Sequence, residues 1–337
     1  MDFLLEVAGF AIKVIAVAIA VAMVMSLIIA QVKRKGSHPF GYLQITSLSD
    51  HFSNLQQGLK QAMLPKKAYK AEMKARKKLK TEPLQKRVFV MDFSGDIAAT
   101  AVADLREQVT GLLTVASKED EVVVRLESPG GIVSNYGLAA SQLVRLREAE
   151  IPITVCIDKV AASGGYLMAA VANKIVAAPF AAVGSIGVLA MIPNFHRLLK
   201  RLDVDYLEMT AGEYKTTLTP MGEITEKGKA KFKEELEEVH QLFKTFISFF
   251  RPQVDIEKIA TGEHWYGQHA MERHLIDHLI TSDDYLLGKR DEAQIYLVEY
   301  HAPKTVKEKM AHILTDASDN LVMRWFQRLF VDRTSRM

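Results

Sequence analysis

Cysteine is almost absent from this chain of 337 residues. Its one cysteine, Cys156, excludes a disulfide within the chain. Because Cys156 lies in the apolar run 153–157, we expect a buried small hydrophobic residue rather than a reactive thiol. A single cysteine of this kind does not distinguish a reducing compartment from an oxidising one.

An excess of charge of either sign is also missing. The chain has 43 basic and 40 acidic residues, for a net charge of +3, so its overall charge gives no reason to expect a nucleic-acid partner. Apolar residues make up 49% and charged residues 25%, which is ordinary for a globular protein with a sizeable core. The length allows one large domain or two smaller ones.

A long apolar run occupies the N-terminus. Residues 7–30 carry a single charge, and some twenty such residues at about 1.5 Å each cross a hydrocarbon core of about 30 Å. A cleaved signal peptide has a basic leader and a shorter apolar stretch, whereas this leader holds Asp2 and Glu6. The sequence therefore predicts a retained membrane anchor over residues 1–31. The basic residues 33–35 favour the cytoplasmic side for the rest of the chain, although large domains also cross membranes despite such flanks.

Positive charge is concentrated in the connector that follows, residues 32–86. Eleven Lys or Arg and only two acids lie from Lys60 to Arg87. The helical stretch around residues 69–79 is polar on nearly all sides. Two interpretations stay open: a solvated helix or stalk, and a surface that adheres to anionic lipid headgroups. Nucleic-acid binding is disfavoured because the run adjoins a predicted membrane span.

Strand and helix patterns alternate from residue 87 onward. Such alternation predicts βαβ units and an α/β fold with a parallel sheet covered on both faces. The predicted strands are 88–93, 121–126, 152–157, 174–178 and one near 206–209, and the predicted helices are 98–115, 132–147, 163–171, 226–250 and 270–280.

A second apolar stretch, residues 160–192, has Lys174 as its one charge. A membrane span and a buried core both fit this composition. Four glycines and a proline interrupt the stretch, and buried parallel strands are continuously apolar in the same way. We therefore predict a buried core here.

Glycine-rich turns follow three of the strands. In an open parallel sheet, sites form where strands end, and helix N-termini present unpaired N–H groups to negative charge. Ser163 begins a predicted helix among small residues, so it is a candidate nucleophile, with the N–H groups of Gly130 and Gly164 as a candidate oxyanion hole. The alternative is that Ser163 only caps the helix. The turns span residues 128–131, 161–165 and 184–187.

A nucleophilic serine needs a base, and the nearby sequence offers no histidine. None lies between Ser163 and Pro193, and His196 begins a basic, solvated segment. The G-x-S-x-G elbow of α/β-hydrolases is not matched, because position 161 is Ala. Lysine is another recognised partner of serine, provided that it is neutral. The residues alone do not single out Lys215 from the other lysines.

Four motifs in order resemble the signal peptide peptidase A family of Ser–Lys peptidases, peptidase family S49. Each motif is weak by itself, but their order and spacing are similar to the family's. The likeness covers residues 88 to about 285, and the N-terminal anchor and basic connector resemble its short inner-membrane members. The motifs are Ser128-Pro129-Gly130-Gly131, Ala161-Ala162-Ser163-Gly164-Gly165-Tyr166, Gly184-Ser185-Ile186-Gly187 and Gly212-Glu213-Tyr214-Lys215.

This resemblance implies a fold like that of the Clp protease and crotonase group. It implies Ser163 as the nucleophile, Lys215 as the base and Ser185 as a second serine that positions the lysine. It also implies an oxyanion hole from the N–H groups of Gly130 and Gly164. Family members assemble as rings or domes, in which serine and lysine can come from neighbouring subunits.

We therefore expect a serine endopeptidase of the bacterial inner membrane that hydrolyses hydrophobic peptides, such as signal-peptide remnants, bound by strand addition. The alternatives are a catalytically silent membrane scaffold and a crotonase-type acyl-CoA enzyme, neither of which needs Ser163 with a neutral Lys215. We expect a homo-oligomer in contact with peptide substrate and membrane lipid, no cofactor, and no metal site. The four histidines between residues 264 and 278 lack an H-E-x-x-H motif. The predicted parts are the anchor (1–31), the connector (32–86), the Ser–Lys peptidase domain (87–290) and an amphipathic tail (291–337).

Overall fold

The computed structural model describes residues 41–78 and 86–303. Leu43–Tyr300 forms one compact unit, which holds every element below apart from the terminal residues of two strands. The predicted anchor and the tail beyond residue 303 lie outside the described residues. Within the described ranges, no helix combines the length and the apolar character that crossing a membrane requires.

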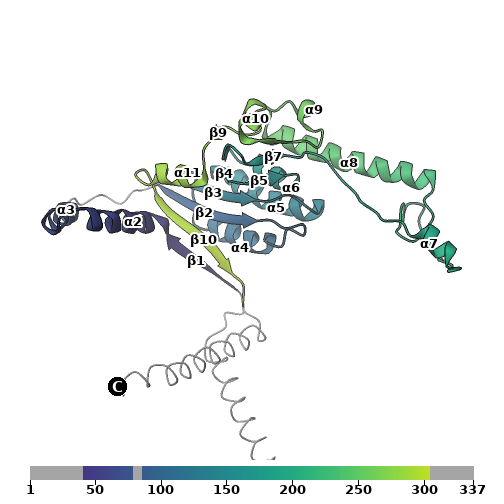
Figure 1. The fold of residues 1–337 in the computed structure, drawn as a ribbon, viewed down its shortest axis with the longest axis horizontal. Coiled ribbons are helices and arrows are strands. Elements are labelled where there is room, and N and C mark those ends of the chain that lie inside the picture. Colours follow the sequence, from purple (N-terminus) through teal and green to yellow (C-terminus); the bar gives the residue numbers. More distant parts are fainter. Residues whose placement is uncertain (1–40, 79–85, 304–337) are drawn as a thin grey trace, which may run out of the picture. The chain divides into compact units, whose positions relative to one another are not determined.

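A seven-stranded sheet runs through the described part of the chain (Figure 1). Its order is β1-β10-β2-β3-β4-β6-β9, and each pair from β10 to β9 is parallel. The parallel sheet that the sequence predicts is thus confirmed. The strands are β1 (Tyr42–Ser47), β2 (Arg87–Ser94), β3 (Glu121–Glu127), β4 (Ile153–Ile157), β6 (Lys174–Ala177), β9 (His278–Leu279) and β10 (Gln294–His301).

Alternating side chains of the central strands enter two separate cores. Phe89, Met91 and Phe93 of β2 face one core, whereas Val88 and Val90 face the other, because successive side chains of a strand point to opposite faces. Helices cover both faces, as a parallel sheet requires. The first face is covered by α4 (Val102–Leu113), α5 (Val133–Glu148), α6 (Gly164–Ala170) and the C-terminal end of α8 (Glu226–Phe250), and the second by α2 (Leu48–Met63) and α11 (Ser282–Lys289).

A three-stranded sheet lies beside the central one and carries two of the three glycine-rich turns, whereas the first turn follows β3 of the central sheet. In its order β5-β7-β8, the first pair is parallel and the second antiparallel. The core prediction for residues 160–192 is confirmed as far as Ile186, since Ala161, Val183 and Ile186 are fully buried, although Phe180 is exposed. It is wrong for residues 189–192, which leave the sheet and are exposed. The elements are β5 (Val160–Ala162), β7 (Ala182–Gly184) and β8 (His264–Tyr266), with the short helices α9 (Ile256–Ile259) and α10 (Gly267–Glu272) nearby in sequence.

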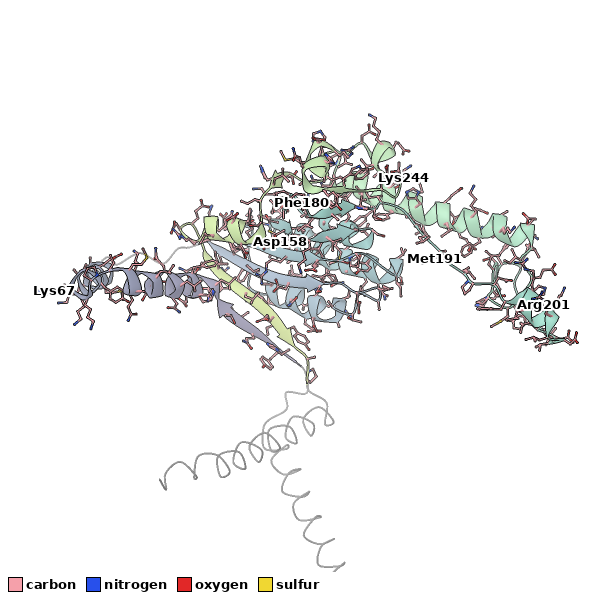
Figure 2. The ribbon with its side chains drawn as sticks, viewed as in Figure 1. Lys67, Asp158, Phe180, Met191, Arg201 and Lys244 are labelled. Carbon is pink, nitrogen blue, oxygen red and sulfur yellow. The ribbon has the colours of Figure 1, made fainter. Side chains whose placement is uncertain are left out.

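Residues 189–242, here called the arm, lead away from the sheets. The arm contains α7 (His196–Arg201) and the N-terminal two-thirds of α8. Figure 2 places Arg201 at the end of the arm far from the sheets and Lys244 at the near end of α8. The arm is held to itself by the Asn194 side-chain amide, which donates to the carbonyls of Thr219 and Gly222. No residue of α7 is buried in the described structure.

Three expectations need correction or extension. The predicted helix 270–280 is wrong: the chain leaves α10 at His274, with φ +59°, and then forms β9, because the open edge of β6 supplies backbone partners. The predicted strand near 206–209 is irregular and exposed, since no strand of the described structure lies beside it. The central sheet also includes β1 from the predicted connector and β10 from the predicted tail, so it uses more of the chain than the predicted peptidase domain.

Candidate active site

Strand pairing brings the three glycine-rich turns together. The register of β5 and β7 places Ala162 beside Gly184, so the residues that follow, Ser163 and Ser185, lie next to each other. Neighbouring strands are about 4.8 Å apart. The Ser163 N–H donates to the Gly184 carbonyl at 2.8 Å, which fixes this juxtaposition. Ser128 of the first turn bridges to Ala161 on the other side of β5.

Ser163 has a backbone conformation that serine rarely adopts. Its φ is +52° and its ψ is −120°, and it stands directly before α6. Such conformations cost about 1–3 kcal/mol and persist where the surrounding structure enforces them, often at functional sites. The hydroxyl makes no capping hydrogen bond to α6. A purely capping role for Ser163 therefore lacks the hydrogen bond that would define it.

The backbone of Gly130 lies against Ser163 and the start of α6. A side chain at Gly130, where φ is +88°, would place its Cβ 2.7 Å from the Ser163 Cβ and 2.9 Å from the Gly164 nitrogen. Glycine is therefore required here by both conformation and space. Gly164 is the first residue of α6, and a helix leaves the N–H groups of its first turn without intrahelical partners. A substrate oxyanion beside Ser163 would meet these N–H groups.

A buried chain of hydrogen bonds runs beneath this turn, which the sequence motifs do not reveal. The Tyr136 hydroxyl donates to the Asp96 carbonyl at 2.7 Å and lies 2.6 Å from Ser128 Oγ. Because a phenol has one hydrogen, Ser128 must donate to Tyr136. Ser128 Oγ in turn accepts from the Gly130 N–H at 3.1 Å. Of the two predicted oxyanion-hole donors, Gly130 thus already has an acceptor within the protein.

Tyr136 also supports Gly164 by direct packing. The Tyr136 side chain is fully buried, and a Cβ on Gly164 would lie 2.4 Å from its Cγ. Burial raises the pKa of Tyr136, with Asp96 adding to the effect and the Ser128 hydrogen bond opposing it, so the hydroxyl keeps its proton. No sequence signal identifies Tyr136, because it reaches the site only through the packing of α5 under α6.

Ser185 has the same positive φ as Ser163, +52°. Its N–H donates to the carbonyl of Glu263 at 2.6 Å, which ties the third turn to the chain before β8. The Trp265 ring lies over Gly184, where a Cβ would be 3.0 Å from Trp265 Cε3. The predicted second serine is therefore held beside the predicted nucleophile.

Lys215 is not brought to Ser163 in the described part of the chain. It is exposed on the arm, and its side chain has no hydrogen bond or ion pair to any described residue. Lys227 of α8 lies beside the loop that bears Lys215, whereas Phe243 of the same helix packs against the core. These two residues are 16 positions apart, or about 24 Å along the helix. The lysine and the serine of one chain thus belong to opposite ends of α8.

The loop that bears Lys215 is docked on α8 by its other side chains. Glu213 pairs with Lys227 at 2.6 Å, and this hydrogen bond and charge lower the pKa of Glu213. The ammonium groups of Lys227 and Lys231 lie 5.6 and 5.5 Å from the centre of the Tyr214 ring, within cation–π range. A local ion pair between Glu213 and Lys215, which would hold the lysine in its charged form, is absent in the described structure. Sequence reasoning did not identify either supporting lysine.

The sequence matches peptidase family S49 over most of its length. The family's N-terminal region, "Peptidase family S49 N-terminal", matches residues 2–143, and "Peptidase family S49" matches residues 145–296. The chain is 46% identical over 341 residues to "Probable protease SohB" of Haemophilus influenzae, with 96% of each chain covered. It is 48% identical over 248 residues to "Probable protease SohB" of Buchnera aphidicola, with 73% of this chain and 74% of the relative covered.

Among solved structures, the chain is similar to a mutant of the 1510-N membrane-bound stomatin-specific protease in complex with a substrate peptide. The sequence identity is 13%, the TM-score is 0.42, and 68% of this chain and 98% of that chain are covered. The family assignment therefore depends on the sequence matches. With both regions of the family matched and a relative of 46% identity aligned nearly end to end, the chain belongs to peptidase family S49, a family of proteases.

Proposed function

We propose that this protein is a membrane-anchored serine endopeptidase with Ser163 as its nucleophile and Lys215 as its base. The observation that carries the proposal is the setting of Ser163. Its hydroxyl does not cap α6, its backbone is held in a rare conformation, and it lies between a helix N-terminus and the backbone of Gly130. These are the requirements of a nucleophile with an adjacent oxyanion hole.

In the proposed reaction, Ser163 Oγ attacks the substrate carbonyl carbon and its proton passes to the neutral amine of Lys215. The N–H of Gly164 donates to the oxyanion of the tetrahedral intermediate. Gly130 shares its N–H between that oxyanion and Ser128 Oγ, or releases the serine as the oxyanion forms. Lys215 then protonates the leaving amine, and later it takes a proton from the water that hydrolyses the acyl-enzyme.

A second copy of the chain supplies Lys215 in this proposal. One chain holds its own lysine at the far end of α8, exposed and without a partner in the described residues. Large apolar side chains are also exposed along the arm, with Leu189 at 77%, Met191 at 82% and Leu207 at 79%. A surface of this kind is typical of a subunit interface. The arm therefore fits a homo-oligomer in which it reaches the site of its neighbour.

An apolar peptide suits the surroundings of the site. Phe180 is 85% exposed and lies edge-on to Tyr266, which is paired with Ala182 of β7. Ala182 stands two residues before Gly184 on the strand that leads to Ser185, so Tyr266 lies beside this strand. The aromatic pair offers an apolar surface to the side chains of an extended substrate such as a signal-peptide remnant. Residues 1–31 would hold the enzyme at the inner membrane, where such peptides occur.

A fluorophosphonate probe tests the nucleophile directly. Wild-type protein should be labelled at Ser163, and Ser163→Ala should lose the label and at least ~10³-fold of peptidase activity. Ser141→Ala is a matched control, because the exposed Ser141 hydroxyl only donates to the Gly137 carbonyl within α5. Retained activity in purified Ser163→Ala would refute the assignment of the nucleophile. A wild-type protein that is neither labelled nor active as a peptidase would favour the scaffold or acyl-CoA alternatives.

A further inference from the structure

The α2–α3 pair, residues 48–78, carries an apolar stripe that is only partly used. The spacing of Leu48, Phe52, Leu55, Leu59 and Met63 places all five on one side of α2. Leu48 and Phe52 pack against the second core. The exposed fraction then rises along the helix, from 55% at Leu55 to 65% at Leu59 and 79% at Met63. The distal half of this stripe therefore needs a partner from outside the described structure.

The second helix of the pair, α3 (Lys66–Lys78), is basic, which indicates that the partner is anionic. Lys66, Lys67, Lys70 and Lys74 are all exposed. The one acid of α3, Glu72, is already paired with Lys60 of α2. The pair thus combines an apolar stripe on α2 with an uncompensated excess of positive charge on α3. In Figure 2, Lys67 marks its end far from the sheets.

We propose that the α2–α3 pair binds the surface of a bilayer that contains anionic phospholipid. A helix whose apolar side is accompanied by lysines is typical of a segment that lies in the headgroup region. A second copy of the same pair would bring a like charge against these lysines, which opposes self-association through this surface. Charge complementarity therefore selects an anionic lipid surface over another copy of the chain.

The length of chain before β1 is compatible with this placement. Ten residues separate the predicted anchor from Tyr42, and ten residues span at most about 35 Å. The pair follows β1 directly, so it would lie within reach of the headgroups if the anchor crosses the membrane. This step alone depends on the proposed anchor. The stripe and the lysines are independent of it and of the peptidase chemistry.

A fluorophore on α2 tests the contact in the full-length protein. In the test protein, Leu59→Cys is labelled with nitrobenzoxadiazole. In the matched control, the same label is attached to Gln61→Cys, two residues away on the opposite side of α2. The native Cys156 is 1% exposed and does not compete for the label. Each protein is reconstituted in nanodiscs of phosphatidylcholine alone or with phosphatidylglycerol, and in lipid-free detergent. The proposed anchor is the same in both labelled proteins and in every nanodisc, so a difference between the two labelled positions reports on α2.

We expect the emission of the label at position 59 to shift to shorter wavelength in phosphatidylglycerol nanodiscs, and to return towards its initial wavelength at high salt. The label at 61 should not shift. The double substitution Lys66→Glu, Lys67→Glu should abolish the shift at 59 while leaving fluorophosphonate labelling of Ser163 intact. An absent shift at 59, an equal shift at 61, or an equal shift in pure phosphatidylcholine would overturn the proposal. A shift in lipid-free detergent that increases with protein concentration would instead assign the stripe to a second copy of the chain.

Discussion

Replacing Gly164 with alanine should destabilise the protein and remove activity, although the same change elsewhere on a helix is stabilising. The added Cβ would lie 2.4 Å from Tyr136 Cγ and 2.6 Å from Tyr136 Cβ. The Tyr136 ring cannot move aside, because it is fully buried and its hydroxyl is held by Ser128 and Asp96. The start of α6, and Ser163 with it, must shift instead.

The sizes of the two opposing effects decide the outcome. Glycine to alanine in a helix gains about 0.5–1 kcal/mol, whereas overpacking a tight core costs typically about 1–3 kcal/mol. Gly137 on α5 is the matched control, because a Cβ there would meet nothing within 4 Å. Gly137→Ala should therefore be stabilising by about 0.5–1 kcal/mol, and Gly164→Ala should be destabilising.

Thermal unfolding followed by circular dichroism measures both effects. Each kcal/mol corresponds to about 2–4 °C in Tm for a unit of this size. A displacement of Ser163 by about 1 Å should also lower kcat/KM by about 10²-fold in Gly164→Ala. Unchanged Tm and unchanged fluorophosphonate labelling in Gly164→Ala would refute the packing argument for the positioning of Ser163.

Two further predictions concern charged pairs. Partial burial raises the pKa of Asp277, but the hydrogen bonds from Arg251 and from the Ile175 N–H, together with the charge of Arg251, outweigh it, so the net pKa is lowered. This stabilisation is present above the unfolded-state pKa of about 3.9 and is lost as pH falls below it, so the free energy of unfolding should decrease in acid. Asp277→Asn should lower the free energy of unfolding by about 3–5 kcal/mol, because the side chain of Arg251 is 2% exposed and would lose its charged partner. Urea unfolding at pH 7 and pH 3 measures both effects. A variant as stable as wild type at pH 7 would refute this role of Asp277. Lys227→Met should leave Tm nearly unchanged, since exposed pairs contribute about 0–1 kcal/mol. Lys227→Met should lower kcat, because the loop of Lys215 loses its ion pair with α8. Lys227→Arg should keep much of the wild-type kcat. Equal kcat in Lys227→Met and wild type would show that the pair with Glu213 does not position Lys215.

Much of the fold follows from local patterns in the sequence. The predicted helix 226–250 coincides with α8. The predicted strand 88–93 differs from β2 by one residue at each end, and 121–126 differs from β3 by one residue at its C-terminal end. These elements have strong periodicity or continuous apolar runs. The short strands β5, β7 and β8 were missed, because three residues carry no period and their pairing depends on distant segments.

Some residues of the candidate site can also be located from local sequence patterns, whereas others depend on how distant segments pack. The turns with Ser163, Ser185 and Gly130 can be located in the sequence, since glycine and small residues mark them. The register of β5 and β7 joins the first two, and the bridge between Ser128 and Ala161 adds the third. The support from Tyr136 could not be predicted, because it comes from helix packing. The position of Lys215 depends on the docking of its loop on α8, which no local pattern encodes.

Co-expression of two inactive variants tests the central claim, that a serine and a lysine from neighbouring copies form one peptidase site. Full-length Ser163→Ala and Lys215→Ala chains should each be inactive when expressed alone. In a random one-to-one mixture, roughly one quarter of the sites would pair an intact Ser163 with an intact Lys215 from the neighbour, because each partner is intact in half of the chains. We therefore predict about a quarter of wild-type activity, with fluorophosphonate labelling confined to the Lys215→Ala chains. Mixed assemblies that are as inactive as either variant alone would contradict the account.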